Sequence, residues 1–383
     1  MRHLLLLLTA ALSLSLAGCP SGPPPVVQDD GSEADGGTDV APPVEQDDEA
    51  AVAALETLAN ELKRDGNGNV VEVNLREVEI DDAALEHLQG LPRVRSVLLN
   101  KTAVTDAGLK TLGEIETLEN IDLRGCATTN EGVAHLAGLT KLRGLRLSTR
   151  QAEDTSDLGG ATSYVDDGAM AEIGKLTNLE VVALDNLFIT QAGLEELAGL
   201  TKLKELYLAG TSIDDDALAV IAKFESLRKL RIAETRIGDA GLAHLKEAQG
   251  LEELDISRCI GITDAGMEHV GELKQLQNLN VWRISGLTNA GVAHLAGLKE
   301  MRWLNLDNIL LTDAGLVHLR DMSELTFLHL GSTGISDAGL THLEHLDKLD
   351  YLNVSRSGVT PAGAAQLQEK LSNAEIVIEY ENE

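Results

Sequence analysis

Residues Leu251–Met267 have the sequence LEELDISRCIGITDAGM, and variants of this stretch recur along most of the chain. Apolar residues occupy its positions 1, 4 and 6, and a Thr-Asp-Ala-Gly segment begins at Thr263. The pattern starts twelve times between Val70 and Leu349, at intervals of 24 or 25 residues with one interval of 37. A period of this length, repeated so often, predicts a solenoid in which each unit packs against its neighbours.

Each unit predicts a short strand followed by a turn and a short helix. Alternation along the strand sends positions 4 and 6 into the core and positions 3, 5 and 7 onto an exposed concave sheet. Thr263 suits a helix N-cap, and Asp264 suits the first helical turn beside the positive end of the helix dipole. Because one unit cannot bury its own leucines, the units must stack.

The pattern resembles the leucine-rich repeat family, in particular the class with repeats of about 24 to 26 residues found in ribonuclease-inhibitor-like, F-box-associated and many bacterial proteins. The resemblance covers about residues 70–380. It implies an α/β solenoid, a right-handed horseshoe of about twelve strand–turn–helix repeats. No F-box precedes the repeats in this sequence, so a role in a ubiquitin ligase does not carry over.

Capping segments are expected on both sides of the repeats, which would occupy residues 70–360. Residues 49–69 predict an N-terminal capping helix and turn, because apolar residues share one helical face between Glu49 and Arg64. Residues 361–383 predict a C-terminal cap. The apolar residues of the expected N-terminal helix are Val52, Leu55, Leu58 and Leu62.

The first residues predict a signal for export. Arg2 precedes an apolar run from Leu4 to Leu16, which is too short to span a bilayer permanently. The run ends in Leu-Ala-Gly-Cys at Cys19, which resembles the bacterial lipoprotein signal. The resemblance implies a signal peptide over residues 1–18 and diacylation of Cys19, which becomes the first residue of a lipid-anchored protein.

Residues 19–48 predict an acidic, proline-rich, disordered tether, because the segment 20–49 holds six prolines and nine acidic residues but no Lys or Arg. Pro20 follows Cys19 where an Asp would favour inner-membrane retention in some bacteria. We therefore expect a bacterial cell-envelope location, with the outer membrane or cell surface preferred.

Composition argues against several function classes. The net charge of −31 disfavours nucleic acid as a partner. No nucleophile elbow, zinc-protease helix, P-loop or dinucleotide glycine motif occurs, so we expect neither an enzyme nor a cofactor, and no catalytic residues.

Seven histidines share one repeat position, which favours local hydrogen bonding over a metal site. Cys126 and Cys259 lie five repeats apart and are expected to be buried free thiols.

Aromatic residues make up only 2% of the chain, yet five of the nine fall on the expected concave face. A polar column at position 5 would run beside them. An exposed aromatic patch with polar neighbours predicts an interaction site, unless the register shifts by one residue or another segment covers the rings. Loss of the Trp303 ring should then abolish binding and leave stability nearly unchanged. The candidate residues are Trp282, Trp303, Phe327, Tyr351, Tyr207, Asn280, Asn305, His329 and Asn353.

The single long interval places an insertion of 13 extra residues at about Thr149–Ser163, after a strand and before Val165. It would project from one lip of the horseshoe. Loops on a repeat scaffold often contact ligands, but a neutral insertion is the more economical interpretation.

These observations predict a membrane-anchored binding module. The expected ligand is a neutral or basic protein, held by the concave sheet. Glycan recognition is an alternative, because aromatic rings stack on sugars while Asn280, Asn305 and Asp307 could bind hydroxyl groups. A third possibility is a structural scaffold of the envelope with no dedicated ligand. The repeats identify a fold, and the ligand depends on the exposed positions.

Overall fold

The computed structural model describes residues 45–148 and 164–379. The expected signal peptide, Cys19, nearly all of the tether, the insertion Thr149–Ser163 and the last four residues lie outside this part of the chain.

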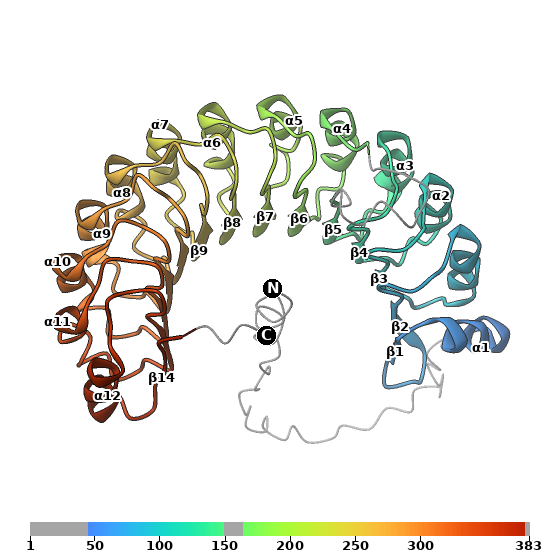
Figure 1. Cartoon of the computed structure of the whole chain (residues 1–383). Helices are drawn as coiled ribbons and strands as arrows, with labels where there is room; N and C mark the ends of the chain where they lie inside the picture. Colours follow the sequence, from blue (N-terminus) through green and yellow to red (C-terminus); the bar gives the residue numbers. More distant parts are fainter. Residues whose placement is uncertain (1–44, 149–163, 380–383) are drawn as a thin grey trace, which may run out of the picture. The chain divides into compact units, whose positions relative to one another are not determined.

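The repeats build one open sheet of fourteen strands that follow each other in chain order. All neighbouring strands are parallel except β1 and β2, which are antiparallel. The strands line the inner side of an arc (Figure 1). They are β1 (Glu61–Arg64), β2 (Val70–Asn74), β3 (Ser96–Leu98), β4 (Asn120–Asp122), β5 (Gly144–Arg146), β6 (Val181–Ala183), β7 (Glu205–Tyr207), β8 (Lys229–Arg231), β9 (Glu253–Asp255), β10 (Asn278–Asn280), β11 (Trp303–Asn305), β12 (Phe327–His329), β13 (Tyr351–Asn353) and β14 (Glu375–Val377).

Short helices form the outer side of the same arc (Figure 1). The α-helices are α1 (Glu49–Leu58), α2 (Asp106–Gly113), α3 (Asn130–Ala134), α4 (Met170–Ile173), α5 (Gln191–Glu196), α6 (Asp215–Ile221), α7 (Asp239–Leu242), α8 (Asp264–Val270), α9 (Asn289–His294), α10 (Asp313–Leu316), α11 (Asp337–Leu340) and α12 (Pro361–Lys370). Turns of 3-10 helix are η1 (Asp82–Gly90), η2 (His135–Gly138), η4 (Asp167–Ala169), η5 (Ala243–Glu247), η6 (Leu295–Gly297) and η7 (Val317–Leu319).

The core is a continuous column of small aliphatic side chains between the sheet and the helices. In the quoted repeat, Leu251, Leu254 and Ile256 at positions 1, 4 and 6 are at most 2% exposed. Burying such a side chain contributes about 1.5–3 kcal/mol, so many repeated contacts replace the missing aromatic rings. The expected register and the solenoid of about twelve repeats, β2 to β13, are confirmed.

The Thr-Asp-Ala-Gly segment joins consecutive repeats, which the sequence did not indicate. Asp264 accepts hydrogen bonds in the next repeat, at 2.7 Å from the Thr288 N–H and 2.6 Å from the Thr288 hydroxyl. It also accepts the Gly291 N–H at 2.8 Å. A Cβ on Gly291 would lie 2.5 Å from the same carboxylate, so only glycine fits there. The Thr288 hydroxyl in turn accepts the N–H of Ala290, as expected of an N-cap.

This Asp-to-Thr (or Ser) joint recurs along the solenoid. The same pair of bonds links Asp82 to Thr105, Asp106 to Thr129, Asp167 to Thr190, Asp239 to Thr263, Asp313 to Ser336 and Asp337 to Thr360. At two junctions an amide takes the role of the carboxylate. Asn289 both accepts the Thr312 N–H and donates to the Thr312 hydroxyl. Asn130 accepts the Asp166 N–H and donates to the Asp166 carboxylate.

Position 8 of the repeats turns the chain away from the strand in a left-handed conformation. Glycine occupies this position at Gly125 and Gly210, but nine other residues also have a positive φ there. Their N–H groups bond to the next repeat, as Arg258 does to the Trp282 carbonyl at 2.8 Å. The turn extends the hydrogen-bond ladder beyond the strands and directs position 8 side chains to the rim of the sheet.

The N-terminal cap differs from the expectation. The helix ends at Leu58 instead of reaching Arg64, and Glu61–Arg64 form β1, antiparallel to β2. A sheet edge left unpaired exposes its backbone donors and acceptors, and β1 covers that of β2. An ion pair of 2.6 Å between Lys63 and Glu72 joins the two strands. At the other end lie α12 and β14.

No helix within residues 45–148 and 164–379 is both long and apolar enough to cross a membrane.

We predict that Asp264→Ala destabilises the fold by about 1–3 kcal/mol, because the Thr288 and Gly291 N–H groups lose their acceptor. Asp264→Asn should cost less, since Asn289 fills the same role in the next repeat. Urea unfolding of the two variants checks this. Equal losses for both variants would contradict a hydrogen-bonded joint.

Candidate binding surface on the concave sheet

Three of the candidate aromatic residues form one stack across β11, β12 and β13. Strand register places Trp303 beside Phe327 and Phe327 beside Tyr351. Ring centroids are 4.9 Å apart in both pairs, with interplanar angles of 9° and 5°. All three side chains are half-buried. We call Trp303, Phe327 and Tyr351 the aromatic ladder.

The stack determines which parts of the rings a ligand can reach. Phe327 has a neighbour on both faces, while Trp303 and Tyr351 each have one face covered. Aromatic pairs of this kind contribute about 0.5–1.5 kcal/mol beyond their buried area. Removal of the Trp303 ring loses one such contact, so a small loss of stability accompanies the nearly unchanged stability predicted from the sequence.

The polar column at position 5 is less exposed than expected. Asn280 and Asn305 are half-buried, but His329 and Asn353 are only 7% and 1% exposed. Each accepts a hydrogen bond from the backbone N–H two residues later, as Asn353 does from Ser355 at 2.9 Å. Short polar side chains often fold back onto the backbone in this way. The column mainly stabilises the turn after each strand, and His329 and Asn353 do not form the exposed surface predicted for them.

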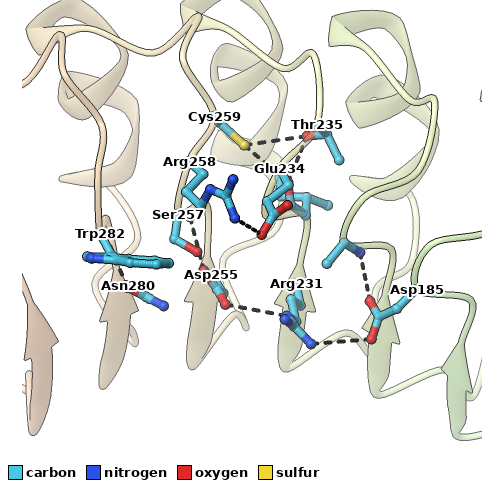
Figure 2. A network of polar contacts seen from close by, with 12 residues as sticks. Asp185, Arg231, Glu234, Thr235, Asp255, Ser257, Arg258, Cys259, Asn280 and Trp282 are labelled. Atoms are coloured by element: carbon cyan, nitrogen blue, oxygen red, sulfur yellow. Dashed lines mark hydrogen bonds and ion pairs between the residues drawn. The ribbon is translucent and has the colours of Figure 1, made fainter. Parts of the chain in front are cut away.

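Trp282 is separate from the aromatic ladder. It follows β10 at position 7, and none of the ring contacts among the described residues includes it. Two guanidinium groups lie over its ring instead, Arg283 at 5.1 Å and Arg258 at 5.9 Å from the centroid. Arg258 also pairs with Glu234 at 2.7 Å, as Figure 2 shows. The structure thus divides the expected continuous patch into a ladder and a rim tryptophan.

Tyr207 lies on β7, four strands away from β11. Its hydroxyl donates to Glu205 at 2.7 Å, and burial is the main cause that raises the pKa of Tyr207 above its usual value. It belongs to a different region of the sheet from the ladder.

The middle of the concave face is a network of paired charges. Asp122 is almost fully buried and binds Arg124 through two bonds of 2.9 and 2.7 Å. Arg231 contacts Asp185 at 3.3 Å and Asp255 at 3.5 Å, as Figure 2 shows. Burial raises the pKa of Asp185, while Arg231 acts in the opposite direction. The charges of this region largely neutralise one another within the chain.

Both cysteines of the repeats are buried thiols, as predicted. The Cys126 thiol donates to the Leu99 carbonyl at 3.1 Å, and the Cys259 thiol makes the same contact with Ile232. Burial raises the pKa of Cys259, which disfavours the reactive thiolate. Within the described residues, no group of three His, Cys, Asp or Glu side chains could hold a metal ion.

Known structures are similar in fold, while no protein-family model and no curated protein matches the sequence. An internalin (inlF) from Listeria monocytogenes superimposes with a TM-score of 0.57 at 18% identity, over 88% of this chain and 96% of that chain. The structure of a Rad7 and Elc1 complex in yeast gives 0.51 at 17% identity, over 78% and 84%. A Leptospira interrogans leucine-rich-repeat protein gives 0.48 at 16%, over 85% and 97%. At these identities the likeness shows the fold.

We predict that His329 makes the fold less stable in mild acid. Burial lowers the pKa of His329 below its usual 6.5, and the carboxylate of Asp307 opposes this shift. Because the unfolded chain then binds a proton more readily than the folded chain, stability is complete above about pH 6.5 and falls as the pH drops below it. His329→Asn, which introduces the residue found at Asn305 in the preceding repeat, should reduce this loss.

Thermal unfolding of wild type and His329→Asn at about pH 7.5 and about pH 5.5 measures the difference. The variant should lose less stability between the two values. An identical pH dependence in both proteins would show that His329 is not the titrating group.

Proposed function

Because the chain has the leucine-rich-repeat fold, we propose that it is a non-enzymatic binding protein whose concave sheet holds a protein partner at the aromatic ladder. The observation that carries the proposal is the in-register stack of Trp303, Phe327 and Tyr351 on the concave sheet face. Tyr and Trp supply large, rigid contact areas and are frequent anchors of protein interfaces. No other part of the described concave face joins three aromatic rings.

The stacking geometry favours a protein over a glycan. A sugar ring binds an aromatic residue by lying flat on an open face, and four of the six faces in the ladder are covered by a neighbouring ring. Asn280 and Asn305 use their side-chain oxygens on the backbone, which removes acceptors that a sugar would need. The remaining ring edges suit apolar side chains of a protein, which pack without a fixed orientation.

The comparison structures are compatible with this proposal. One of them is the structure of a Rad7 and Elc1 complex in yeast, in which the matched chain superimposes on 78% of this chain. Fold likeness alone does not transfer a partner, so the proposal for this chain rests on its own exposed residues.

The proposal includes a lipid anchor on Cys19. The Leu-Ala-Gly-Cys sequence supports it, and one acyl chain alone would give only reversible membrane binding. Diacylation would hold the protein at a bacterial envelope membrane, with the acidic segment 19–48 as a spacer. The outer membrane or the cell surface is the preferred location, because Pro20 follows the cysteine.

We predict that Phe327→Leu weakens partner capture at least about tenfold, because it removes the ring shared by both stacking contacts. The full chain, carrying a photo-crosslinking residue at position 351, is irradiated with envelope extract and the products are identified. Tyr207→Leu, which also replaces an aromatic ring by leucine but lies five strands away, is the matched control. Equal crosslinking by both variants, or capture of a glycan alone, would contradict the proposal.

We predict that cells expressing the wild type incorporate a labelled fatty acid into the protein, and that Cys19→Ser abolishes the label. Cys126→Ser serves as the control, because its buried thiol is inaccessible to acylation. Gel fluorescence after metabolic labelling in a bacterial host checks this. A label that persists in Cys19→Ser would remove the anchor from the account.

A further inference from the structure

The carboxylate of Asp307 lies two residues beyond the end of β11, the strand that carries Trp303, and its one ion-pair contact among the described residues is with His329 at 3.9 Å. It occupies position 7 after β11, and its side chain is 16% exposed. One carboxylate oxygen, Oδ1, is buried without a hydrogen-bond partner in the described chain. A carboxylate removed from water without a partner is costly, so this arrangement needs an explanation.

His329 is the nearest ionisable group, but in its neutral form it does not compensate Asp307. Its Nδ1 is 3.9 Å from the Asp307 carboxylate and accepts the Gly331 N–H at 3.3 Å. An Nδ1 that accepts a hydrogen bond carries no proton in the neutral ring, so it has nothing to donate to the carboxylate. Two acceptors therefore face each other at this point of the sheet.

The neighbouring arginine is also directed elsewhere. The guanidinium of Arg283 lies over the Trp282 ring at 5.1 Å, and no ion pair joins it to Asp307 among the described residues.

Asp185 shows how the same repeat position is neutralised elsewhere in this chain. It too lies at position 7, and its side chain is 15% exposed, but Arg231 at position 5 two repeats later contacts it at 3.3 Å. Two repeats after Asp307, position 5 is occupied by Asn353. This residue is buried and bonded to Ser355. Asn353 carries no charge, so the cation that serves Asp185 has no counterpart at this position.

We propose that Asp307 anchors a basic side chain of the protein partner, an ammonium or guanidinium group that takes the place of an internal arginine. This inference rests on the proposed function and specifies the chemistry of its partner. The chain's net charge of −31 attracts a basic surface, and the side chain of Asp307 is partly exposed to such a surface. Charge-assisted hydrogen bonds to a carboxylate are among the strongest that proteins make.

The test uses the full chain and two defined probes, an alternating Gly-Arg peptide and an alternating Gly-Ser peptide. The only two tryptophans of the chain, Trp282 and Trp303, both lie on this part of the sheet, so their fluorescence reports binding. The Gly-Arg peptide should bind wild type, and Asp307→Asn should weaken it about tenfold or more. Glu268→Gln, on the exposed face of α8, changes the net charge equally and should leave binding unchanged.

The urea midpoint of unfolding gives a second measurement. If Asp307 only stabilised the fold, its substitution would lower this midpoint, whereas the proposed role predicts that the midpoint stays the same or rises. Asp307→Asn should leave the urea midpoint unchanged or raise it, because an uncompensated charge disappears. Asp185→Asn should lower it, because Arg231 loses one of its two carboxylate partners. If Asp307→Asn unfolds more easily and binds the Gly-Arg peptide as tightly as wild type, the inference is overturned.

The outcomes also separate this inference from the proposed function. If Phe327→Leu loses the crosslinked partner while Asp307→Asn retains it, the ladder is the binding site and Asp307 is not its anchor. If the Gly-Ser peptide binds as well as the Gly-Arg peptide, no basic side chain is recognised and the inference also fails.

Discussion

The stacking of one repeat on the next is the constraint on which the rest of the structure depends. A single strand and helix cannot bury its leucines, and at most junctions an Asp that accepts hydrogen bonds from the Thr or Ser of the following repeat fixes how the units meet. Parallel strands then lie about 4.8 Å apart. The rings of the aromatic ladder repeat at 4.9 Å, so their stacking follows directly from strand register. The backbone of the solenoid thus sets the geometry of its candidate binding surface.

The sequence predicted the features that depend on periodicity. Alternation assigned core and concave positions correctly, and repeat spacing identified the strands that bring Trp303, Phe327 and Tyr351 together. It did not predict contacts between repeats, because local rules assign Asp264 to its own helix, whereas the carboxylate binds the next one. A Gly three residues after the helix N-cap in nine of the twelve units was the available signal, since a glycine that recurs at one repeat position marks a close approach.

The sequence pattern also did not predict how deeply individual side chains are buried or where the chain turns after each strand. Alternation gives the face of a side chain but not whether it folds back onto the backbone, and so His329 was expected to be exposed and is buried. The left-handed turn at position 8 was missed because residues such as Glu234 and Arg258, not glycine, occupy it. At the N-terminus, the apolar periodicity predicted a helix up to Arg64, but Glu61–Arg64 instead form a strand that pairs with the edge of the sheet. Tertiary hydrogen bonds override local propensity in each case.

The concave sheet therefore combines two physically different regions. In the middle, Asp185 and Asp255 both pair with Arg231, so the charge of that guanidinium is engaged within the chain. Beyond β10, aromatic rings stack on the sheet, and the carboxylate of Asp307 has a buried oxygen without a hydrogen-bond partner among the described residues. Groups left uncompensated in a folded chain reduce its stability, and a partner that compensates them gains the difference. We assign partner binding to this second region.

Hydroxyl-radical footprinting of the chain with and without its captured partner tests this assignment most directly, because oxidation reports the exposure of each aromatic side chain. We predict that the partner protects Trp303, Phe327 and Tyr351 from oxidation. Tyr164 and Phe188, which are 66% and 68% exposed and lie outside the concave strands, should remain reactive. Protection of Tyr164 and Phe188 with an unchanged ladder would contradict the account and move the interface to the rim of the repeats.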